Sequence, residues 1–372
     1  MKIVADSQIP LVEEAFSAFG PVELVHSRDI TKEVIKGAEL LLVRSVTKVD
    51  QKLIEGTHVR FAATATAGAD HVDREWLNSQ HIGFASAPGC NALAVAEYVA
   101  AALLVLSQKR NVSLHGKKIG IVGVGNVGSR VHTLARVLGM ECLLCDPPLQ
   151  RKTGVSHFRS FPQLLHEADI VTLHVPLTIK GEDATYHLLN DETLQQMKTG
   201  AWLINSSRGE VCDEPSLRKH RSRLQGLALD VWAHEPAINP AMVAAADIAT
   251  PHIAGYSAQG KMRATWMIYQ AACAFFYKTA TWAPTQAEQE AKRIEIKNSA
   301  DPVFAAVMQA CPLLRDDTAL RAAVTNDKKD IGGNFESLRG KYRHRQEFAN
   351  YHVIGASDQD AIRLRELGFA VE

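Results

Sequence analysis

The sequence predicts an α/β protein built around doubly wound parallel sheets. Short apolar runs that end in small or polar residues alternate with helix-like segments, a pattern typical of parallel strands that are buried on both faces. The chain has 372 residues, which is too long for one hydrophobic core and indicates two or three domains. A glycine-rich turn near the middle of the chain lies between a strand-like run and a helical pattern, as expected where a parallel strand enters a crossover helix.

The N-terminal part of the chain predicts a small α/β domain. Its strand-like runs are "KIVAD", "PVELVHS", "AELLLVRS", "VRFAATATAG" and "IGFASAPG", and residues 11–19 are helix-like. Residues 91–110 then predict a long helix. Its apolar run, residues 92–106, contains Glu97 and is too short to span a bilayer, so we expect a buried core helix and no membrane partner.

The middle of the chain predicts the larger sheet. "KIGIVGVG" is a strand that enters the glycine turn, a helix follows from Asn126, and "ECLLC" is the next strand. The later strands are "DIVTLHVP", "AWLINSS", "LQGLALDVW" and "DIATPHIA", with helices at 161–167 and 191–198 between them. This alternation predicts a doubly wound parallel sheet.

Beyond that sheet, residues 265–277 predict an apolar helix and residues 279–293 a linker or arm. The third segment runs from about residue 290 to the end. It contains the basic cluster "RGKYRHRQEF", a strand-like "YHVIGAS" and a final helix.

Composition excludes several classes of protein. The chain has 41 basic and 41 acidic residues and a formal net charge of zero, which argues against a nucleic-acid partner. The apolar run at the N-terminus is too short for a secretory signal, and six cysteines in a chain of this length do not indicate a disulfide framework. These features predict a location in the reducing cytoplasm.

Cys142 and Cys145 form a C-x-x-C pair in "MECLLCDPP". A redox or zinc pair needs both sulfurs to face one point. Residues three apart on a strand face opposite sides, so we interpret the pair as structural and predict no metal site.

The glycine turn carries a dinucleotide fingerprint. Gly123, Gly125 and Gly128 form G-x-G-x-x-G after a strand and at the start of a helix, and Asp146 follows the last glycine by 18 positions. This context predicts a Rossmann-type domain with a pyrophosphate at the helix start. A carboxylate at the end of the second strand accepts hydrogen bonds from ribose hydroxyls and repels a 2′-phosphate, which favours NAD over NADP. The alternative is that Asp146 only forms the turn before Pro147.

Three ionisable residues follow later strands of this sheet. Arg208 follows "LINSS", Glu235 follows "LALDVWAH" and His252 follows "DIATP". Oxidation of a hydroxy acid by hydride transfer needs a guanidinium for the carboxylate, an imidazole for the hydroxyl proton and a carboxylate that orients the imidazole. The three residues fit these roles, although each alone is more often a structural or solvated side chain.

A polar cluster follows a strand of the first domain. Arg44, Ser45, Thr47 and Lys48 can present hydroxyls, cations and backbone N–H groups to an anion such as a phosphate. The alternative is a solvated loop.

With these segments the sequence resembles the D-isomer-specific 2-hydroxyacid dehydrogenase family. The residues that carry the resemblance are "GIVGVGNVGSR", "INSSRGEVCDE", "LDVWAHEP" and "TPHIAGYS", and the match runs to about residue 285. The resemblance implies that Arg208, Glu235 and His252 are catalytic. It also implies a flavodoxin-like substrate domain (1–92, completed by about 256–285), a Rossmann-type NAD domain (93–255) and a small C-terminal α+β dimerisation domain (286–372).

Four further segments, "LLVRSVTKVD", "ATATAGADHVD", "SAPGCNALAVAEYV" and "HIAGYSAQGK", resemble members of the family that act on a phosphorylated acid. The resemblance implies a homodimer that oxidises 4-phospho-D-erythronate with NAD in pyridoxal 5′-phosphate biosynthesis. The substrate contacts that it implies are Ser45, Thr66 and Tyr256. The cofactor contacts that we expect from the fingerprint and the resemblance are Gly123, Gly125, Asn126, Val127, Gly128, Asp146, Val175, Ser206, Ser207, Arg208, Asp230 and Gly255.

Two other functions stay open at this point. One is another D-2-hydroxyacid dehydrogenase, such as one that acts on 3-phosphoglycerate. The other is an NAD-sensing, co-repressor-like binding protein, which predicts a disordered tail, whereas the tail "YHVIGASDQDAIRLRELGFAVE" has a foldable pattern. We expect the basic cluster Arg339, Lys341, Arg343, His344 and Arg345 to be a solvated face, with contact to a neighbouring subunit's phosphate site as the alternative.

Overall fold

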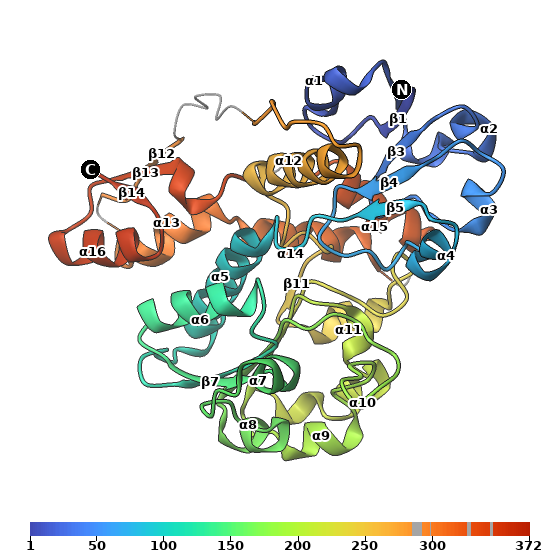
Figure 1. Cartoon of the computed structure of the whole chain (residues 1–372). Helices are drawn as coiled ribbons and strands as arrows, with labels where there is room; N and C mark the ends of the chain where they lie inside the picture. The colour runs from blue at the N-terminus through green and yellow to red at the C-terminus, as the bar shows by residue number, and fades with distance from the viewer. Residues whose placement is uncertain (285–291, 298, 326–328, 343–344) are drawn as a thin grey trace. The chain divides into compact units, whose positions relative to one another are not determined.

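The computed structural model describes residues 1–284, 292–297, 299–325, 329–342 and 345–372 (Figure 1). The chain forms two compact units. The first consists of residues 1–91 and 257–290, and the second of residues 92–256 and 291–372. Arg343 and His344 of the basic cluster lie outside the described residues.

The first unit has a five-stranded parallel sheet in the order β2-β1-β3-β4-β5, which is the flavodoxin-like order that we expected. Apolar residues of α1 and α12 cover one face of this sheet, and those of α2, α3 and α4 cover the other. The elements are β1 (Ile3–Asp6), α1 (Val12–Phe16), β2 (Val22–Val25), α2 (Lys32–Ile35), β3 (Leu40–Val43), α3 (Gln51–Ile54), β4 (Phe61–Thr64), α4 (Arg74–Ser79), β5 (Gly83–Ala85) and α12 (Ala258–Phe275).

The second unit contains a six-stranded parallel sheet in the order β11-β10-β9-β8-β6-β7. The chain moves from β6 outward to β7 and then returns to β8 on the other side of β6. The carboxyl ends of β6 and β8 therefore form the switch point where doubly wound sheets bind ligands. The strands are β6 (Lys118–Val122), β7 (Glu141–Cys145), β8 (Ile170–Leu173), β9 (Trp202–Asn205), β10 (Gly226–Leu229) and β11 (Ile248–Ala249).

Helices pack on both faces of this sheet, as the doubly wound prediction requires. Apolar residues of α5 and α6 share one core with β6, and those of α8, α9, α10 and α11 form a second core on the other face. The helices are α5 (Ala92–Arg110), α6 (Gly128–Val137), α7 (Pro147–Thr153), α8 (Phe161–Glu167), α9 (Asp191–Gln196), α10 (Glu214–Lys219) and α11 (Pro240–Ala245). The expected start of α6 at Asn126 lies two residues before the observed start, a usual uncertainty for a helix end.

The C-terminal segment adds a three-stranded parallel sheet, β12-β13-β14, and four helices among the described residues. Strand β12 begins inside the stretch that we expected to be a linker (279–293), so that linker ends earlier than predicted. The elements are β12 (Lys292–Glu295), α13 (Pro302–Ala310), α14 (Leu313–Ala323), α15 (Ile331–Gly340), β13 (Tyr351–Ile354), α16 (Asp358–Glu366) and β14 (Ala370–Val371).

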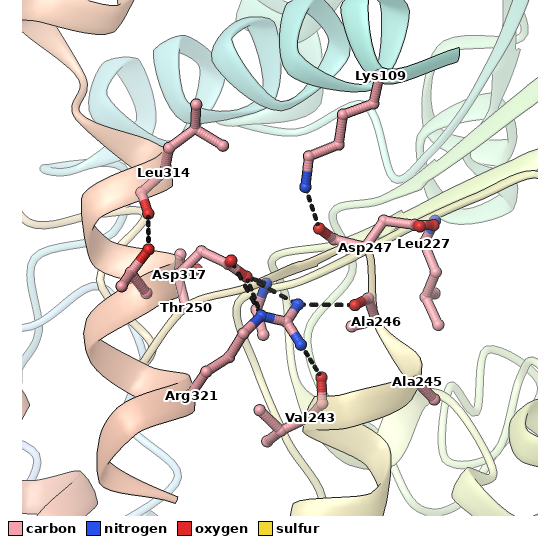
Figure 2. A network of polar contacts seen from close by, with 12 residues as sticks. Lys109, Leu227, Val243, Ala245, Ala246, Asp247, Thr250, Leu314, Asp317 and Arg321 are labelled. Carbon is pink, nitrogen blue, oxygen red and sulfur yellow. Dashed lines mark hydrogen bonds and ion pairs between the residues drawn. The ribbon is translucent and has the colours of Figure 1, made fainter.

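A buried polar network fixes α14 to the edge of the larger sheet (Figure 2). The Asp317 carboxylate accepts a hydrogen bond from the backbone N–H of Ala249 at 2.7 Å and from Nε of Arg321 at 3.0 Å. Arg321 in turn donates to the carbonyls of Val243 and Ala246 at 2.8 and 2.7 Å. Because β11 is the edge strand, Asp317 satisfies a buried N–H that no further strand can pair.

Among the described helices, α5 alone is long and apolar enough to cross a membrane by length and composition. However, 72% of its apolar stretch is buried inside the protein, as in the core helix of a globular domain. The helix extends beyond the apolar run 92–106 of the sequence, so the length of that run did not by itself exclude a membrane-spanning helix. Its Glu97 is 1% exposed and forms an ion pair with Arg345 at 2.5 Å. The expected solvated basic face is therefore wrong for Arg345, which is 5% exposed.

Candidate active site

The glycine turn has the close packing that a dinucleotide loop needs. Gly123 has φ +84°, and a Cβ there would lie 2.5 Å from the carbonyl oxygen of His174. A Cβ on Gly128 would lie 1.9 Å from the carbonyl oxygen of Gly123. Gly125 has nothing within 4 Å of a built Cβ. Two glycines therefore allow the turn and the helix to close, and the exposed third leaves the backbone open to a ligand such as a pyrophosphate.

Asp146 has the turn-forming role that the sequence left open, and its binding of ribose stays a prediction. Its Oδ2 accepts a hydrogen bond from the backbone N–H of Val124 at 2.7 Å, and its Oδ1 accepts from Leu149 at 2.9 Å as the N-cap of α7. The carboxylate is thus a turn-forming acid that also fixes the glycine turn. Each oxygen retains a second acceptor position, so the side chain can still bind ribose hydroxyls.

Residues after β8 and β9 contribute to the same edge of the sheet. Val175 lies against the glycine turn, since its Cγ1 would be 2.9 Å from a Cβ on Gly123. The hydroxyl of Ser206 is buried and has no hydrogen-bond partner among the described residues, whereas that of Ser207 donates to Asn205 at 2.8 Å. A buried hydroxyl that lacks a partner among the described residues fits a site whose ligand completes the hydrogen bonding.

His252 and Glu235 meet. Nδ1 of His252 lies 2.7 Å from Oε2 of Glu235, and the side chains are 30% and 19% exposed. Because Nδ1 donates this hydrogen bond, the proton of the neutral imidazole is held on that side, and Nε2 keeps its lone pair. The pair therefore has the arrangement of a general base and the carboxylate that orients it.

Neighbouring groups hold this pair in place. The backbone N–H of Trp232 donates to Oε1 of Glu235 at 2.9 Å, and the indole N–H donates to the carbonyl of Thr250 at 2.9 Å. The backbone N–H of His252 donates to the carbonyl of Asp230 at 2.7 Å. Both catalytic candidates are thus tied to the carboxyl end of β10, and nothing in the spacing of the sequence singled out Trp232 or Thr250 for this role.

Asp230 is a buried carboxylate, 1% exposed, that organises the turn after β11. It accepts hydrogen bonds from the hydroxyl of Thr250 at 2.6 Å and from the N–H groups of Ile253 and Ala254 at 2.8 and 2.9 Å. Tyr98 of α5 extends this series of hydrogen bonds, since its hydroxyl oxygen lies 2.7 Å from the hydroxyl oxygen of Thr250. Gly255 follows directly and is half-buried. Asp230 therefore determines the path of the backbone from His252 to Gly255.

The two acids of the site differ in pKa. Burial raises the pKa of Asp230 above its usual range, against the opposing effects of the His252 charge and the hydrogen bonds that it accepts. Burial also raises the pKa of Glu235, but the His252 charge, their hydrogen bond and the charge of Arg339 outweigh it, so that this pKa is lowered overall. Glu235 is therefore ionised near neutral pH and can stabilise an imidazolium.

Arg208 lies at the carboxyl end of β9. Its Nη1 donates to the carbonyl of Ser207 at 2.7 Å, and its own carbonyl accepts from Asn205 at 2.9 Å. The next residue, Gly209, packs so closely on Trp232 that a Cβ would lie 1.9 Å from the Trp232 carbonyl carbon. The backbone beside Arg208 is thus held against the segment that carries Glu235, as a substrate clamp on this edge would require.

The polar cluster of the first unit differs in part from the expectation. Arg44 donates from Nε to the buried carboxylate of Asp6 at 3.0 Å, and the hydroxyl of Thr47 donates to the carbonyl of Ser27 at 3.2 Å. Lys48 forms an ion pair with Asp50 at 3.1 Å. Arg44 and Thr47 are therefore occupied within the unit, whereas Ser45 is exposed at the end of β3.

Thr66 follows β4, and its hydroxyl donates to the carbonyl of Gly68 at 2.7 Å and lies 2.7 Å from that of Thr64. Tyr256 belongs to the second unit, where the edge of its ring meets Tyr342 with centroids 5.8 Å apart. The roles of Ser45, Thr66 and Tyr256 in substrate binding stay predictions.

The C-x-x-C pair lies on β7, with Cys145 buried and Cys142 half-buried. Burial raises the pKa of both thiols to about 11, which keeps them protonated and unreactive at neutral pH. All six cysteines are unpaired, and the described residues contain no group of three or more His, Cys, Asp or Glu side chains that could hold a metal ion.

Comparisons with known proteins agree with this geometry. Residues 97–254 match the family described as D-isomer specific 2-hydroxyacid dehydrogenase, NAD binding domain. Among solved structures, the NAD+-bound 3-phosphoglycerate dehydrogenase of Entamoeba histolytica is similar with a TM-score of 0.64 and 26% identity, covering 76% of this chain and 98% of that one. The D-lactate dehydrogenase of Aquifex aeolicus, solved with NAD and lactic acid, shares the fold, with a TM-score of 0.63 and 24% identity over 74% of this chain and 96% of that one.

Two curated relatives match nearly the whole chain. The erythronate-4-phosphate dehydrogenase of Salinibacter ruber is 43% identical over 371 residues, covering 96% of this chain and 95% of the relative. The enzyme of the same name from Salmonella arizonae is 40% identical over 380 residues, covering 99% and 98%. Identity at this level over both chains shows that the protein belongs to the erythronate-4-phosphate dehydrogenase family, within the D-isomer specific 2-hydroxyacid dehydrogenases.

Proposed function

We propose that this chain is an NAD-dependent dehydrogenase that oxidises 4-phospho-D-erythronate at C2 to 2-oxo-3-hydroxy-4-phosphobutanoate, a step of pyridoxal 5′-phosphate biosynthesis. The family supports the type of reaction, and the relatives that match nearly the whole chain and are named for erythronate 4-phosphate support the substrate. One structural observation carries the proposal. It is the 2.7 Å hydrogen bond between Glu235 and His252, which leaves Nε2 of the imidazole as the base.

The residues at the carboxyl edge of the larger sheet fit NAD. The open backbone at Gly125 and the start of α6 suit the pyrophosphate, and Asp146 suits the adenosine ribose. Ser206 has a buried hydroxyl that finds no hydrogen-bond partner in the part of the chain that the structure describes. NAD, when bound, supplies the acceptor for the hydride that leaves C2. The remaining chemistry belongs to side chains of this protein.

In the proposed oxidation, Nε2 of His252 takes the proton of the C2 hydroxyl as the C2–H bond breaks. The imidazole becomes an imidazolium, and Glu235 stabilises that charge because it accepts the Nδ1–H hydrogen bond in both states. The guanidinium of Arg208 holds the substrate carboxylate, which fixes C2 relative to the imidazole. In the reverse direction the imidazolium returns the proton to the C2 oxygen.

The proposal includes a homodimer in the cytoplasm. Six unpaired cysteines suit a reducing compartment. An exposed Leu314 on α14, in the segment predicted to dimerise, suits a surface that a second copy covers.

The experiment that tests the function compares initial rates of NADH formation with 4-phospho-D-erythronate, 3-phosphoglycerate and an unphosphorylated D-2-hydroxy acid. We expect the first to have the highest kcat/KM. His252→Asn should lower kcat by about two orders of magnitude or more, because the transition state loses its base. His166→Asn, an exposed histidine on α8, is the matched control and should leave kcat unchanged.

Fast turnover of 3-phosphoglycerate with an inert 4-phospho-D-erythronate would replace the proposed substrate. Near-normal turnover by the His252→Asn variant would remove His252 from the mechanism. Absence of turnover with every acid, together with measurable NAD binding, would favour the binding-protein alternative.

A further inference from the structure

Helix α15 of the C-terminal segment packs on the turn that carries Glu235. A Cβ built on Gly332 would lie 3.6 Å from Cγ of Pro236, the residue after Glu235. Phe335, one turn further along, is fully buried and belongs to the same apolar core as Trp232 and Ile238. The segment on both sides of Glu235 is therefore supported by a helix that lies outside the residues of the dinucleotide domain.

Arg339, in the last turn of α15, contacts Tyr256, which lies four residues after His252, the other half of the pair. Its guanidinium carbon lies 5.9 Å from the ring centroid of Tyr256 and 5.8 Å from that of Phe335, both within the range of cation–π contacts. Its Nε is buried and has no hydrogen-bond partner among the described residues. The rings of the two aromatic residues are thus the contacts that hold this guanidinium.

Tyr256 has a second contact from the same segment. The ring of Tyr342 meets it edge-on, and the Tyr342 hydroxyl donates to Oδ2 of Asp316 on α14 at 3.0 Å. The position of Tyr256 therefore depends on a guanidinium from one side chain and an aromatic ring whose own orientation is fixed by a hydrogen bond.

Three charged side chains that act on His252 or on its partner Glu235 come from different parts of the second unit. Glu235 accepts its hydrogen bond, Asp230 lies at the end of β10 close enough for the two charges to interact, and Arg339 adds a positive charge close enough to Glu235 to help lower the pKa of that acid.

We propose that Arg339 is a positioning residue of the dehydrogenase site, which holds the ring of Tyr256 and places a positive charge beside the Glu235–His252 pair. The inference rests on the proposed function for its catalytic meaning, because it assigns the C-terminal segment a direct role in that same site. The charge helps to lower the pKa of Glu235, so that this acid stays ionised as the acceptor of the His252 Nδ1–H hydrogen bond.

The test compares Arg339→Gln, Arg339→Lys and a control, Arg363→Gln, in which an exposed arginine of α16 is neutralised. The first measurement needs no turnover. The protonation of the His252 ring is followed by NMR with labelled histidine, and its signal is identified as the one missing from His252→Asn. In Arg339→Gln the titration midpoint should move to higher pH by about half a unit, because a cation that opposed the imidazolium is gone. It should not move in Arg339→Lys or Arg363→Gln.

The second measurement is kinetic. Both Arg339 variants lose the flat guanidinium that lies against Tyr256, so the KM for 4-phospho-D-erythronate should rise about threefold to tenfold, the size expected for a partly buried cation–π contact. The Arg339→Gln variant should also show its acid limb of kcat/KM at higher pH, whereas Arg339→Lys keeps that limb and shows the KM effect alone.

An unchanged His252 titration in a folded Arg339→Gln protein would overturn the charge role, and an unchanged KM in both variants would overturn the Tyr256 role. If Arg339→Gln does not fold, Arg339→Lys decides through its KM. Failure of the function itself has a different signature, since the wild-type protein would then lack turnover while the His252 titration still responded to Arg339→Gln.

Discussion

At the scale of single residues, the Asp146 side chain stabilises two neighbouring segments, the glycine turn and the start of α7. Its oxygens accept the N–H groups of Val124 in the glycine turn and Leu149 in α7. In Asp146→Asn the amide oxygen can keep one of these bonds, but the NH₂ group then faces the other N–H. We expect a loss of about 1–2 kcal/mol in the free energy of unfolding and a Kd for NAD about tenfold higher.

The measurements are urea unfolding and a titration of the protein's tryptophan fluorescence with NAD. Asp301→Asn is the matched control, because the Asp301 carboxylate caps α13 by accepting from the N–H of Phe304 at 2.9 Å, and asparagine is an equally good N-cap. It should alter neither quantity by a measurable amount. Equal stability of the Asp146 and Asp301 variants would show that the bond to Val124 contributes nothing.

The residues that the sequence identified most reliably are those whose role is local. The glycine turn follows from its strand-turn-helix context, and the bond between Glu235 and His252 fits the roles expected from their places after two neighbouring strands. The sequence was less informative where the partner is remote. Arg44 was expected to face an anion, but its partner is Asp6 on β1, a contact that only the folded sheet creates. Arg339 shares this property, since its aromatic partner Tyr256 is far away along the chain.

At the scale of elements, the strands of the two larger sheets and the final helix α16 were predictable, whereas α13, α14 and α15 of the C-terminal segment were not. In α14 the buried positions Leu313, Asp316, Asp317 and Leu320 have the spacing of one helix face. Two of the four are acids, so an apolar pattern does not reveal the helix. The acids are there because Asp316 accepts from Tyr342 and Asp317 accepts from the backbone of β11.

Through this contact Asp317 supports the strand that precedes His252, the proposed base. Asp317→Ala would leave the N–H of Ala249 without an acceptor and the charge of Arg321 without its carboxylate (Figure 2). We expect a loss of about 2–4 kcal/mol in the free energy of unfolding. Since β11 ends three residues before His252, kcat should also fall.

Asp317→Asn retains an oxygen for Ala249, so it should lose less stability than Asp317→Ala. The neighbouring exposed residue provides a control, and Thr318→Ala should change the free energy of unfolding by no more than about 0.5 kcal/mol. Urea unfolding and steady-state rates give both values. A kcat that stays normal while stability drops would mean that the turn after β11 holds His252 without help from α14.

At the scale of the whole molecule, the C-terminal segment and the dinucleotide domain form one compact unit with a common core. Leu313, Phe348 and Val353 belong to the same apolar core as Val99 and Leu103 of α5. The sequence predicted a third domain that serves dimerisation. The C-terminal segment also stabilises its own chain, because it shares a core with the dinucleotide domain, caps the edge of the larger sheet and contacts Tyr256.

The buried ion pair between Glu97 and Arg345 joins α5 of the dinucleotide domain to the C-terminal segment. Besides the pair, Glu97 accepts from the N–H of Phe348 at 2.7 Å, and Arg345 donates to the carbonyls of Ala94 and Gln346. Because both charges are buried, removal of one strands the other. We therefore expect Glu97→Ala to cost about 3–5 kcal/mol in the free energy of unfolding, measured in urea.

The double variant Glu97→Gln with Arg345→Met separates two contributions to the free energy of unfolding: the cost of a buried charge without a partner, and the stabilisation by the ion pair itself. Glutamine keeps an oxygen for the Phe348 N–H, and methionine fills the space of the arginine stem without a charge. The double variant should therefore be more stable than Glu97→Ala by about 2 kcal/mol or more, and it should unfold in a single transition like the wild type. A double variant that is as unstable as Glu97→Ala would instead mean that the ion pair itself holds the C-terminal segment on α5. A second transition would mean that the segment and the dinucleotide domain fold separately once the pair is gone.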